Sequence, residues 1–194
     1  MTEKKVYILL TDTGTLFTKT IKLYTRKPYN HASIAFDENL TQTYSFGRKK
    51  PRNPFIGGFI RENTKEGLFE NATCAVYSLT VRATDFDKMQ QCIKKLDAEK
   101  DNYRYNLIGL IAVIFNKQLK RENAFFCSQF VASVLKQSDS IDFNKPTSLV
   151  TPHDLQTTAN IELVYQGKLK DYNKRTTNKQ YTNMICSPAG IVSV

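Results

Sequence analysis

The alternation of apolar and polar positions along the chain predicts a series of short strands and helices. Apolar runs rich in β-branched residues predict strands over residues 6–11, 30–36, 40–46, 72–81 and 161–165. Apolar residues at helical spacing predict helices over residues 16–24, 84–96, 103–115 and 123–135, and Thr151-Pro152 predicts one further helical turn. The segment 103–115 is aromatic and then apolar, so we expect it to be buried against the helix at 123–135.

The strands at 30–36 and 40–46 flank the residues 37–39, which predicts a hairpin with a three-residue loop. In that register Ser45 lies directly across from His31. In another register a different residue would lie near His31, so Thr43, which is on the same face as Ser45 and diagonal to His31, is the alternative.

Two segments lack a regular apolar pattern. Residues 47–63 contain prolines and glycines that interrupt regular structure, and we expect a loop there. This expected loop carries a basic cluster of Arg48, Lys49, Lys50 and Arg52. Residues 170–194 are basic and polar, which predicts a C-terminal tail that packs loosely or docks across a single domain formed by residues 1–169.

Composition narrows the class of protein. The 194 residues are 41% hydrophobic and 24% charged, which is typical of a globular domain and excludes disorder of the whole chain. The apolar runs at 6–10 and 107–115 are too short for a signal peptide or a membrane span, so we expect an intracellular, cytoplasmic protein. The net charge of +10 is compatible with an anionic partner or with solvated surface, and we do not expect a nucleic-acid partner.

The four cysteines form no closely spaced pair, so neither a zinc site nor a disulfide framework is indicated, and the sequence suggests no cofactor. Cys127 differs from the other three because the apolar stripe of its helix begins there, after Asn123 as the expected N-cap. The first turn of a helix favours an anion and therefore a thiolate. The alternative is that Cys127 is a buried structural residue.

A cysteine nucleophile needs an imidazole nearby, and the chain has only His31 and His153. His153 lies in the first turn of a short helix, whereas His31 begins a strand that should reach the core. His31 is therefore the better candidate for the base.

Four segments then carry a resemblance to a known family. They are Tyr29-Asn-His-Ala-Ser-Ile-Ala-Phe36, Tyr103-Arg-Tyr-Asn-Leu107, Phe126-Cys-Ser-Gln-Phe-Val131 and Thr151-Pro-His-Asp-Leu155. In this order they resemble the permuted papain-like amidases and peptidases of the YiiX type, within the NlpC-like superfamily, over roughly residues 5–166. The resemblance implies an α+β fold in which a small antiparallel, barrel-like sheet packs on a helical half.

The resemblance also implies a thiol hydrolase with Cys127 as nucleophile and His31 as base, and it implies that His153 is not catalytic. Members commonly have a glutamate or another polar residue on the strand after the histidine, where this chain offers Ser45 or Thr43. The expected substrate is a small-molecule, peptide or lipid-like acyl compound, either with or without an anionic group. The rival hypothesis is a non-catalytic papain-like module that binds an anionic partner.

Overall fold

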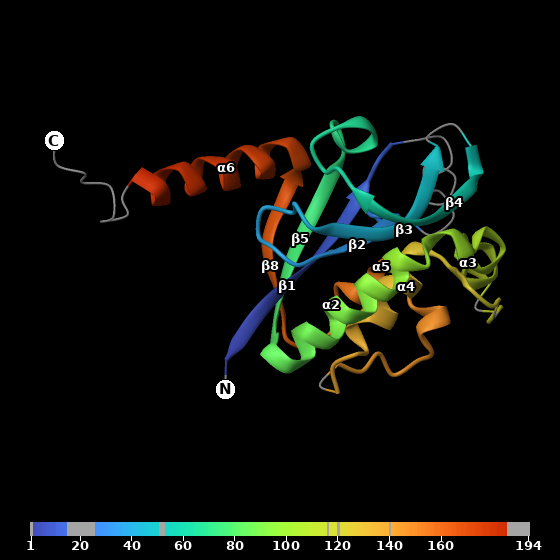
Figure 1. Ribbon diagram of the computed structural model, residues 1–194. Helices are drawn as coiled ribbons and strands as arrows, with labels where there is room; N and C mark the ends of the chain where they lie inside the picture. Colours follow the sequence, from blue (N-terminus) through green and yellow to red (C-terminus); the bar gives the residue numbers. More distant parts are fainter. Residues whose placement is uncertain are drawn as a thin grey trace, which may run out of the picture.

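A six-stranded antiparallel sheet forms the main layer of the protein, with the strand order β4-β3-β2-β1-β5-β8 (Figure 1). The computed structural model describes residues 2–14, 26–50, 53–115, 117–119, 121–139 and 141–185. Its strands are β1 (Glu3–Asp12), β2 (His31–Ala35), β3 (Thr43–Lys50), β4 (Asn53–Glu62), β5 (Thr73–Arg82) and β8 (Ile161–Lys168). A separate pair of short parallel strands consists of β6 (Arg104–Tyr105) and β7 (Ala124–Phe125).

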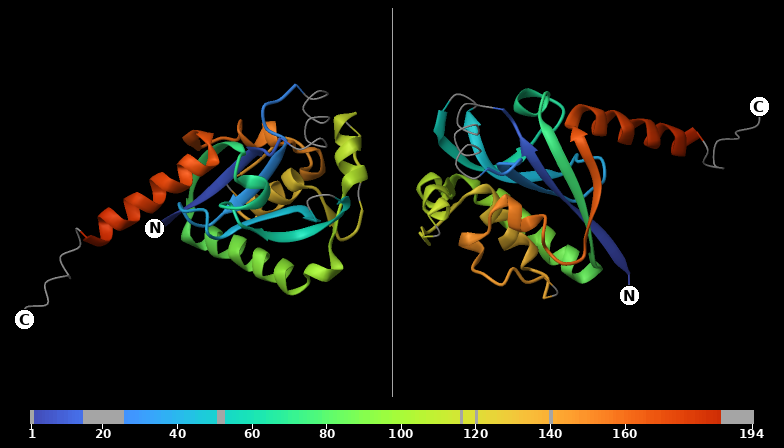
Figure 2. Two further views of the ribbon diagram at one scale, coloured as in Figure 1. Left: turned by 90° about the horizontal axis from the view of Figure 1, so that it is seen from above. Right: turned by 180° about the vertical axis from the view of Figure 1, so that it is seen from behind.

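The central strand β1 is buried on both faces, which explains its uninterrupted apolar run. Ile8 and Leu10 pack in the cluster that includes Phe86 of α2 (Ala83–Ala98) and Phe130 of α4 (Cys127–Leu135). Tyr7 and Leu9 belong to a second cluster on the opposite face, which includes the start of α6 (Leu169–Ile185). The two views in Figure 2 agree that α2 and α4 lie on one side of the sheet and that α6 extends away from it.

Several predicted elements are confirmed. The strands predicted at 6–11, 72–81 and 161–165 correspond to β1, β5 and β8, and the helix predicted from residue 84 is α2. The helical turn after Thr151 is α5 (Pro152–Leu155). The helix predicted at 16–24 lies outside the described residues. Among the described residues, no helix is both long and apolar enough to cross a membrane.

The register predicted for the β2–β3 hairpin is wrong. Ile34 pairs with Tyr44 and Ala35 with Thr43, so the pairing is shifted by two residues from the prediction. The turn is longer than three residues because the Asp37 carboxylate accepts hydrogen bonds from the backbone N–H of Thr41 and of Gln42. A shift of two residues leaves Ser45 on the same face as His31 but no longer directly opposite it.

The loop predicted over residues 47–63 is also wrong, because β3 and β4 continue as a hairpin through most of this segment. Glycines suit β4 at this place for a packing reason. A Cβ atom on Gly57 would lie 2.6 Å from the carbonyl oxygen of Gly47 and 2.8 Å from Cβ of Tyr105. The glycine therefore allows a close approach of backbones rather than marking a loop.

Three further expectations need correction. Asn123 is not the N-cap of the cysteine helix: α4 begins at Cys127, and its N-cap is Phe126. The helix expected to be buried, α3 (Leu107–Ile114), exposes Ile108 and Ile111. The segment expected as a tail without regular structure forms helix α6, and its first turns dock on the domain, which was one of the two alternatives, through the buried residues Leu169, Tyr172, Asn173 and Thr176.

Candidate functional site

Cys127 is the first residue of α4, so its side chain lies in the first helical turn as the sequence predicted. The helix is held by its second residue: the hydroxyl of Ser128 donates a hydrogen bond of 2.7 Å to the carbonyl oxygen of Val150. Cys127 is 1% exposed. The start of α4 is therefore fixed against the segment that precedes α5.

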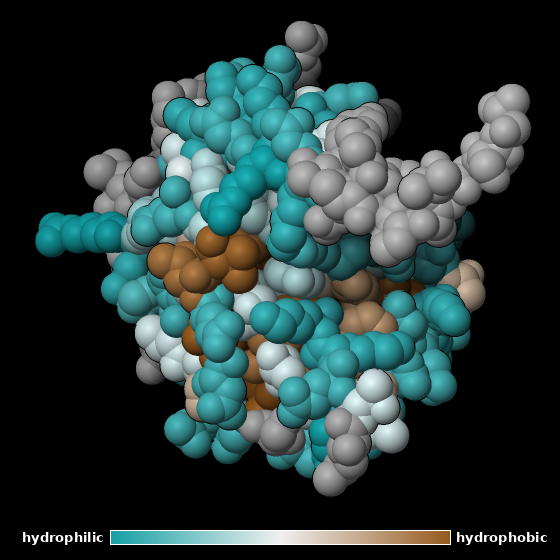
Figure 3. Space-filling view, turned by 90° about the vertical axis from the view of Figure 1, so that its left-hand side faces the viewer, coloured by the Kyte–Doolittle hydropathy of each residue, from teal (hydrophilic) through white to brown (hydrophobic). Residues whose placement is uncertain are grey.

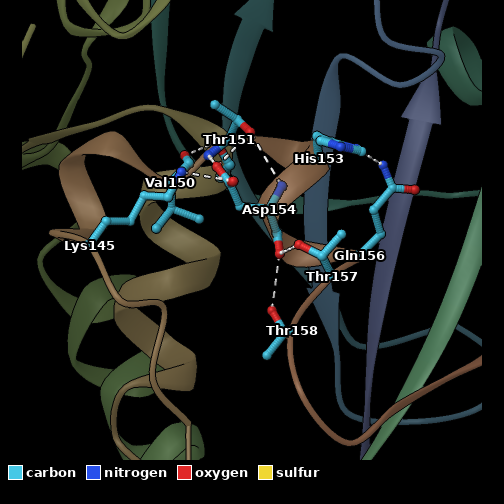
Figure 4. A network of polar contacts seen from close by, with 9 residues as sticks. Lys145, Val150, Thr151, His153, Asp154, Gln156, Thr157 and Thr158 are labelled. Atoms are coloured by element: carbon cyan, nitrogen blue, oxygen red, sulfur yellow. Dashed lines mark hydrogen bonds and ion pairs between the residues drawn. The ribbon is translucent and has the colours of Figure 1, made fainter. Parts of the chain in front are cut away.

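That segment is stabilised by a network around Asp154 (Figure 4). The Thr151 backbone N–H donates to Asp154 Oδ2 at 2.7 Å and the Asp154 backbone N–H donates to the Thr151 hydroxyl oxygen at 3.3 Å, which together form a capping box at the start of α5. The Thr151 hydroxyl also donates to Asp154 Oδ2 at 2.7 Å. Lys145 Nζ lies 2.8 Å from Asp154 Oδ1. Burial alone would raise the pKa of Asp154, but the hydrogen bonds from Lys145 and Thr151 lower it, so this carboxylate stays charged and stabilises the segment behind Cys127.

His153 lies in the same network and away from the cysteine. Its Nδ1 is 2.7 Å from Nε2 of Gln156. Gln156 in turn accepts a hydrogen bond from the hydroxyl of Tyr77, so His153 is oriented by neighbours on α5 and β5.

His31 lies between a carboxylate and the cysteine. Its Nε2 is 2.7 Å from Oε1 of Glu62, the last residue of β4. The side chain of Cys127 is close enough to the same imidazole to contribute to raising the pKa of His31. Because Nε2 is engaged by Glu62, Nδ1 is the ring nitrogen that remains for the sulfur. The carboxylate of Glu62 and the side chain of Cys127 thus both act on the imidazole of His31.

The Glu62 carboxylate is buried, and its side chain is 1% exposed. Besides His31, it accepts hydrogen bonds of 2.5 Å from the hydroxyl of Ser45 and of 2.5 Å from the hydroxyl of Ser33. Burial alone would raise the pKa of Glu62, but the charge of His31 and these hydrogen bonds lower it. Glu62 is therefore held as a carboxylate.

Glu62 and Cys127 keep His31 protonated. Burial alone would lower the pKa of His31, but the negative charge of Glu62 and the hydrogen bonds to Cys127 and Glu62 raise it to about 10. At neutral pH the ring is then an imidazolium beside the side chain of Cys127.

Tyr105 is brought to the site by the small β6–β7 sheet. The pairing of Tyr105 with Phe125, which is two residues before Cys127, places it beside the start of α4. Burial and the negative charge of Cys127 raise the pKa of Tyr105 well above its ordinary value, although Arg48 opposes this rise. The phenol therefore stays protonated and can donate a hydrogen bond near the sulfur.

A cavity of about 470 Å³ opens beside His31. Tyr105, Phe69 and Ile60 contribute its aromatic and apolar walls, while charge comes from Arg48, Lys49, Arg61, Glu62 and Glu66. The predicted basic cluster thus contributes Arg48 and Lys49 from β3, although Lys49 also lies 4.0 Å from Asp101. The side chain of Lys50 and the whole of Arg52 lie outside the described part of the chain.

The structure brings together three of the four site residues considered from the sequence, namely Cys127, His31 and Ser45. Ser45 contacts Glu62, whereas Thr43 donates its hydrogen bond to the carbonyl oxygen of Leu40 in the turn. The sequence reasoning missed Glu62 because it placed residues 47–63 in a loop. The signal was the apolar content of Phe55, Ile56, Phe59 and Ile60, which ends at this acidic residue. The sequence also gave no indication of a role for Tyr105.

Among the described residues, no group of histidine, cysteine, aspartate and glutamate side chains is arranged to hold a metal ion. Comparisons with protein-family models, with curated proteins and with solved structures find no match to this chain.

Proposed function

We propose that the protein is a thiol hydrolase that cleaves an amide, ester or thioester bond, with Cys127 as nucleophile and His31 as general acid and base. The observation that carries this proposal is the 2.7 Å contact between Glu62 and His31, together with the raised pKa of His31, to which both Glu62 and Cys127 contribute. A base oriented by a third group is the arrangement shared by unrelated hydrolases with an activated nucleophile.

In the first step the Cys127 thiolate attacks the carbonyl carbon of the substrate, and the electrons of the C=O bond move to its oxygen. The His31 imidazolium then donates its proton to the leaving amine, alcohol or thiol as the C–N, C–O or C–S bond breaks. The product is a thioester on Cys127.

In the second step water replaces the leaving group. Neutral His31 accepts a proton from water, the hydroxide attacks the thioester carbonyl, and the carboxylic acid departs as Cys127 returns to the thiolate with His31 protonated. An amine acceptor in place of water would give acyl transfer by the same route.

Two donors are available for the oxyanion that forms in each step. The backbone N–H of Cys127 belongs to the first turn of α4, where amide hydrogens have no partner within the helix. The hydroxyl of Tyr105, kept protonated by its raised pKa, would be the second donor. We assign Glu62 as the positioning residue for His31, and Ser45 and Ser33 as the donors that hold Glu62.

We further propose that the α+β arrangement is a circularly permuted papain-like fold. The histidine strand β2 precedes the cysteine helix α4 in the chain, and α4 packs against β2 and β3 of the antiparallel sheet. A glutamate at the end of β4, one strand further than the sequence analysis considered, supplies the third polar group that this family commonly has.

The rival function is a non-catalytic module that binds an anionic partner in the cavity beside His31. It is favoured by the burial of Cys127, which is 1% exposed, and by the presence of Arg48 and Lys49 at the cavity. The two functions differ in the reactivity of the sulfur.

A thiol-directed, activity-based probe separates them. At neutral pH Cys127 should be labelled far faster than Cys74, Cys92 and Cys186, and mass spectrometry of the peptides would measure each rate. Burial raises the pKa of Cys74 to about 12 and also raises that of Cys92, so these two thiols give a slow internal reference.

The matched controls use the two histidines of the chain. His31→Ala should abolish the fast labelling of Cys127, and His153→Ala should leave it unchanged. Equal labelling of Cys127 and Cys92 in the wild-type protein would exclude the hydrolase and leave the binding module.

A further inference from the structure

Helix α3 presents an apolar face to solvent close to the candidate site. Ile108 is 58% exposed and Ile111 is 48% exposed, while Phe115, one turn further, is 60% exposed. The residues lie at positions i, i+3 and i+7, so they share one side of the helix. The opposite side faces the protein, where Leu110 is buried.

Helix α3, which carries this face, has hydrogen bonds at both of its ends. Asn106 caps it by accepting a hydrogen bond of 2.9 Å from the backbone N–H of Gly109. The backbone N–H of Lys117 closes the other end on the carbonyl oxygen of Ala112 at 2.9 Å. Leu119, 37% exposed, extends the apolar surface beyond the helix.

The segment that carries this face is basic, and the nearest acidic residues along the chain, Asp101 and Glu122, lie just outside it. From residue 103 to residue 121 the chain contains four basic residues and no acidic residue. Of the basic residues, Arg104, Lys117 and Arg121 are described and exposed. The backbone N–H of Arg104 donates to the carbonyl oxygen of Asn123, which places the arginine beside the strand that follows Arg121.

We propose that α3 docks the protein on an anionic lipid bilayer, with Ile108, Ile111 and Phe115 in the interface and the basic residues against the headgroups. An apolar face flanked by lysine and arginine is the pattern of helices that lie in the plane of a membrane surface. The eight residues of α3 span about 12 Å at 1.5 Å per residue, against a hydrocarbon core of about 30 Å, so the helix lies on the bilayer and does not cross it.

The position of α3 relates this surface to the candidate site. The helix begins two residues after Tyr105, which lines the cavity beside His31. Docking through α3 would therefore hold the cavity at the bilayer surface. The opposite side of the molecule is largely hydrophilic, with apolar residues in several places between the hydrophilic ones (Figure 3).

The experiment measures sedimentation of the full-length chain with vesicles of phosphatidylcholine containing about one third phosphatidylserine, and with vesicles of phosphatidylcholine alone. The wild-type chain should bind the anionic vesicles and lose binding near 1 M salt, where charges are screened beyond about 3 Å. Ile108→Gln combined with Ile111→Gln should weaken binding by roughly ten-fold or more, because two apolar side chains no longer leave water.

The structure offers a matched control in Leu163, which is 54% exposed on β8. Leu163→Gln should not change vesicle binding. Lys117→Gln and Arg121→Gln should each weaken it by about five-fold, the effect of one basic residue near an anionic surface. All substituted side chains are exposed, and circular dichroism would verify that each variant is folded.

The inference is overturned if the wild-type chain binds neither kind of vesicle, or if the α3 variants bind as the wild type does. It is also overturned if size-exclusion chromatography shows a dimer that the α3 variants convert to monomer, since the face would then belong to a second copy. Cys127→Ala should bind vesicles like the wild type, so failure of the proposed hydrolase would not affect this result.

Discussion

The substitution Glu62→Gln tests the electrostatic basis of the candidate site directly. Glutamine has the size of glutamate but no negative charge, and because an NH2 group replaces one carboxylate oxygen, its remaining oxygen can accept from only one of Ser33 and Ser45, which donate to different oxygens of Glu62. The change therefore removes the charge opposite Nε2 of His31 while it retains the shape of the buried site.

Two magnitudes give the size of the expected effect. The His31 pKa is raised from 6.5 to about 10, which at 1.36 kcal/mol per pKa unit corresponds to about 5 kcal/mol of preference for the protonated ring. Coulomb's law for unit charges at the 2.7 Å Nε2–Oε1 distance gives about 6 kcal/mol with an effective dielectric constant near 20. The two energies are of similar size, so the charge of Glu62 is a major cause of the raised pKa; because burial lowers the pKa of His31, the contributions of the Glu62 hydrogen bond and of Cys127 are needed as well.

In Glu62→Gln we therefore expect the His31 pKa to fall towards 6.5. Proton NMR of the imidazole Hε1 signals would measure it, and His153→Gln would assign the two histidine signals. Labelling of Cys127 by the probe should fall on the order of 10²-fold or more at pH 7, since loss of the buried carboxylate from a serine protease triad costs about 10⁴ in kcat.

The matched control is Glu66→Gln, an exposed glutamate at the same cavity, which should leave the His31 pKa and the labelling rate unchanged. If His31 titrated near 6.5 in the wild-type protein, or near 10 in Glu62→Gln, the electrostatic argument would be refuted.

Three further predictions follow from the same geometry. Ser45→Ala should lower stability by about 1.5–3 kcal/mol and slow the labelling of Cys127, because a buried carboxylate loses a donor; Thr43→Ala should lower only stability. Thermal melts and probe rates would compare them, and the opposite ranking of rates would show that Ser45 does not support the site. Gly57→Ala should destabilise the fold by about 1–3 kcal/mol in chemical denaturation, since its Cβ would lie 2.6 Å from a backbone oxygen; an unchanged midpoint would contradict the strand placement. The pKa of Glu62 is lower in the folded protein than in the unfolded chain, where it is near 4.5. The carboxylate therefore stabilises the fold at pH values above 4.5, and this stabilisation is lost as the pH falls through the pKa of Glu62 in the folded protein. The raised pKa of His31 stabilises the fold below pH 6.5, and this stabilisation is lost as the pH rises through about 10. Denaturant unfolding at a series of pH values should show a loss of stability at the acidic end and another at the basic end, and both losses should be smaller in Glu62→Gln.

The sequence alone predicted three elements whose structure is controlled by a local pattern. The buried run of β1, the periodic face of α2 and the cap-and-proline start of α5 were all predicted, since strand burial, helical spacing and capping are properties of neighbouring residues. Local reasoning also placed Cys127 at the start of a helix and preferred His31 to His153.

Only the tertiary structure decided which groups meet across the sheet. The glycines of β4 suggest a loop when the sequence is read locally, yet Gly57 is required by the approach of Tyr105 from a distant strand. The same error hid Glu62, because its role depends on the β3–β4 pairing that brings it to His31. Likewise, the apolar composition of α3 predicted burial, whereas exposure depends on whether another element covers the helix. Pairing, close approach and coverage are relations between residues far apart in the chain, so no local pattern determines them.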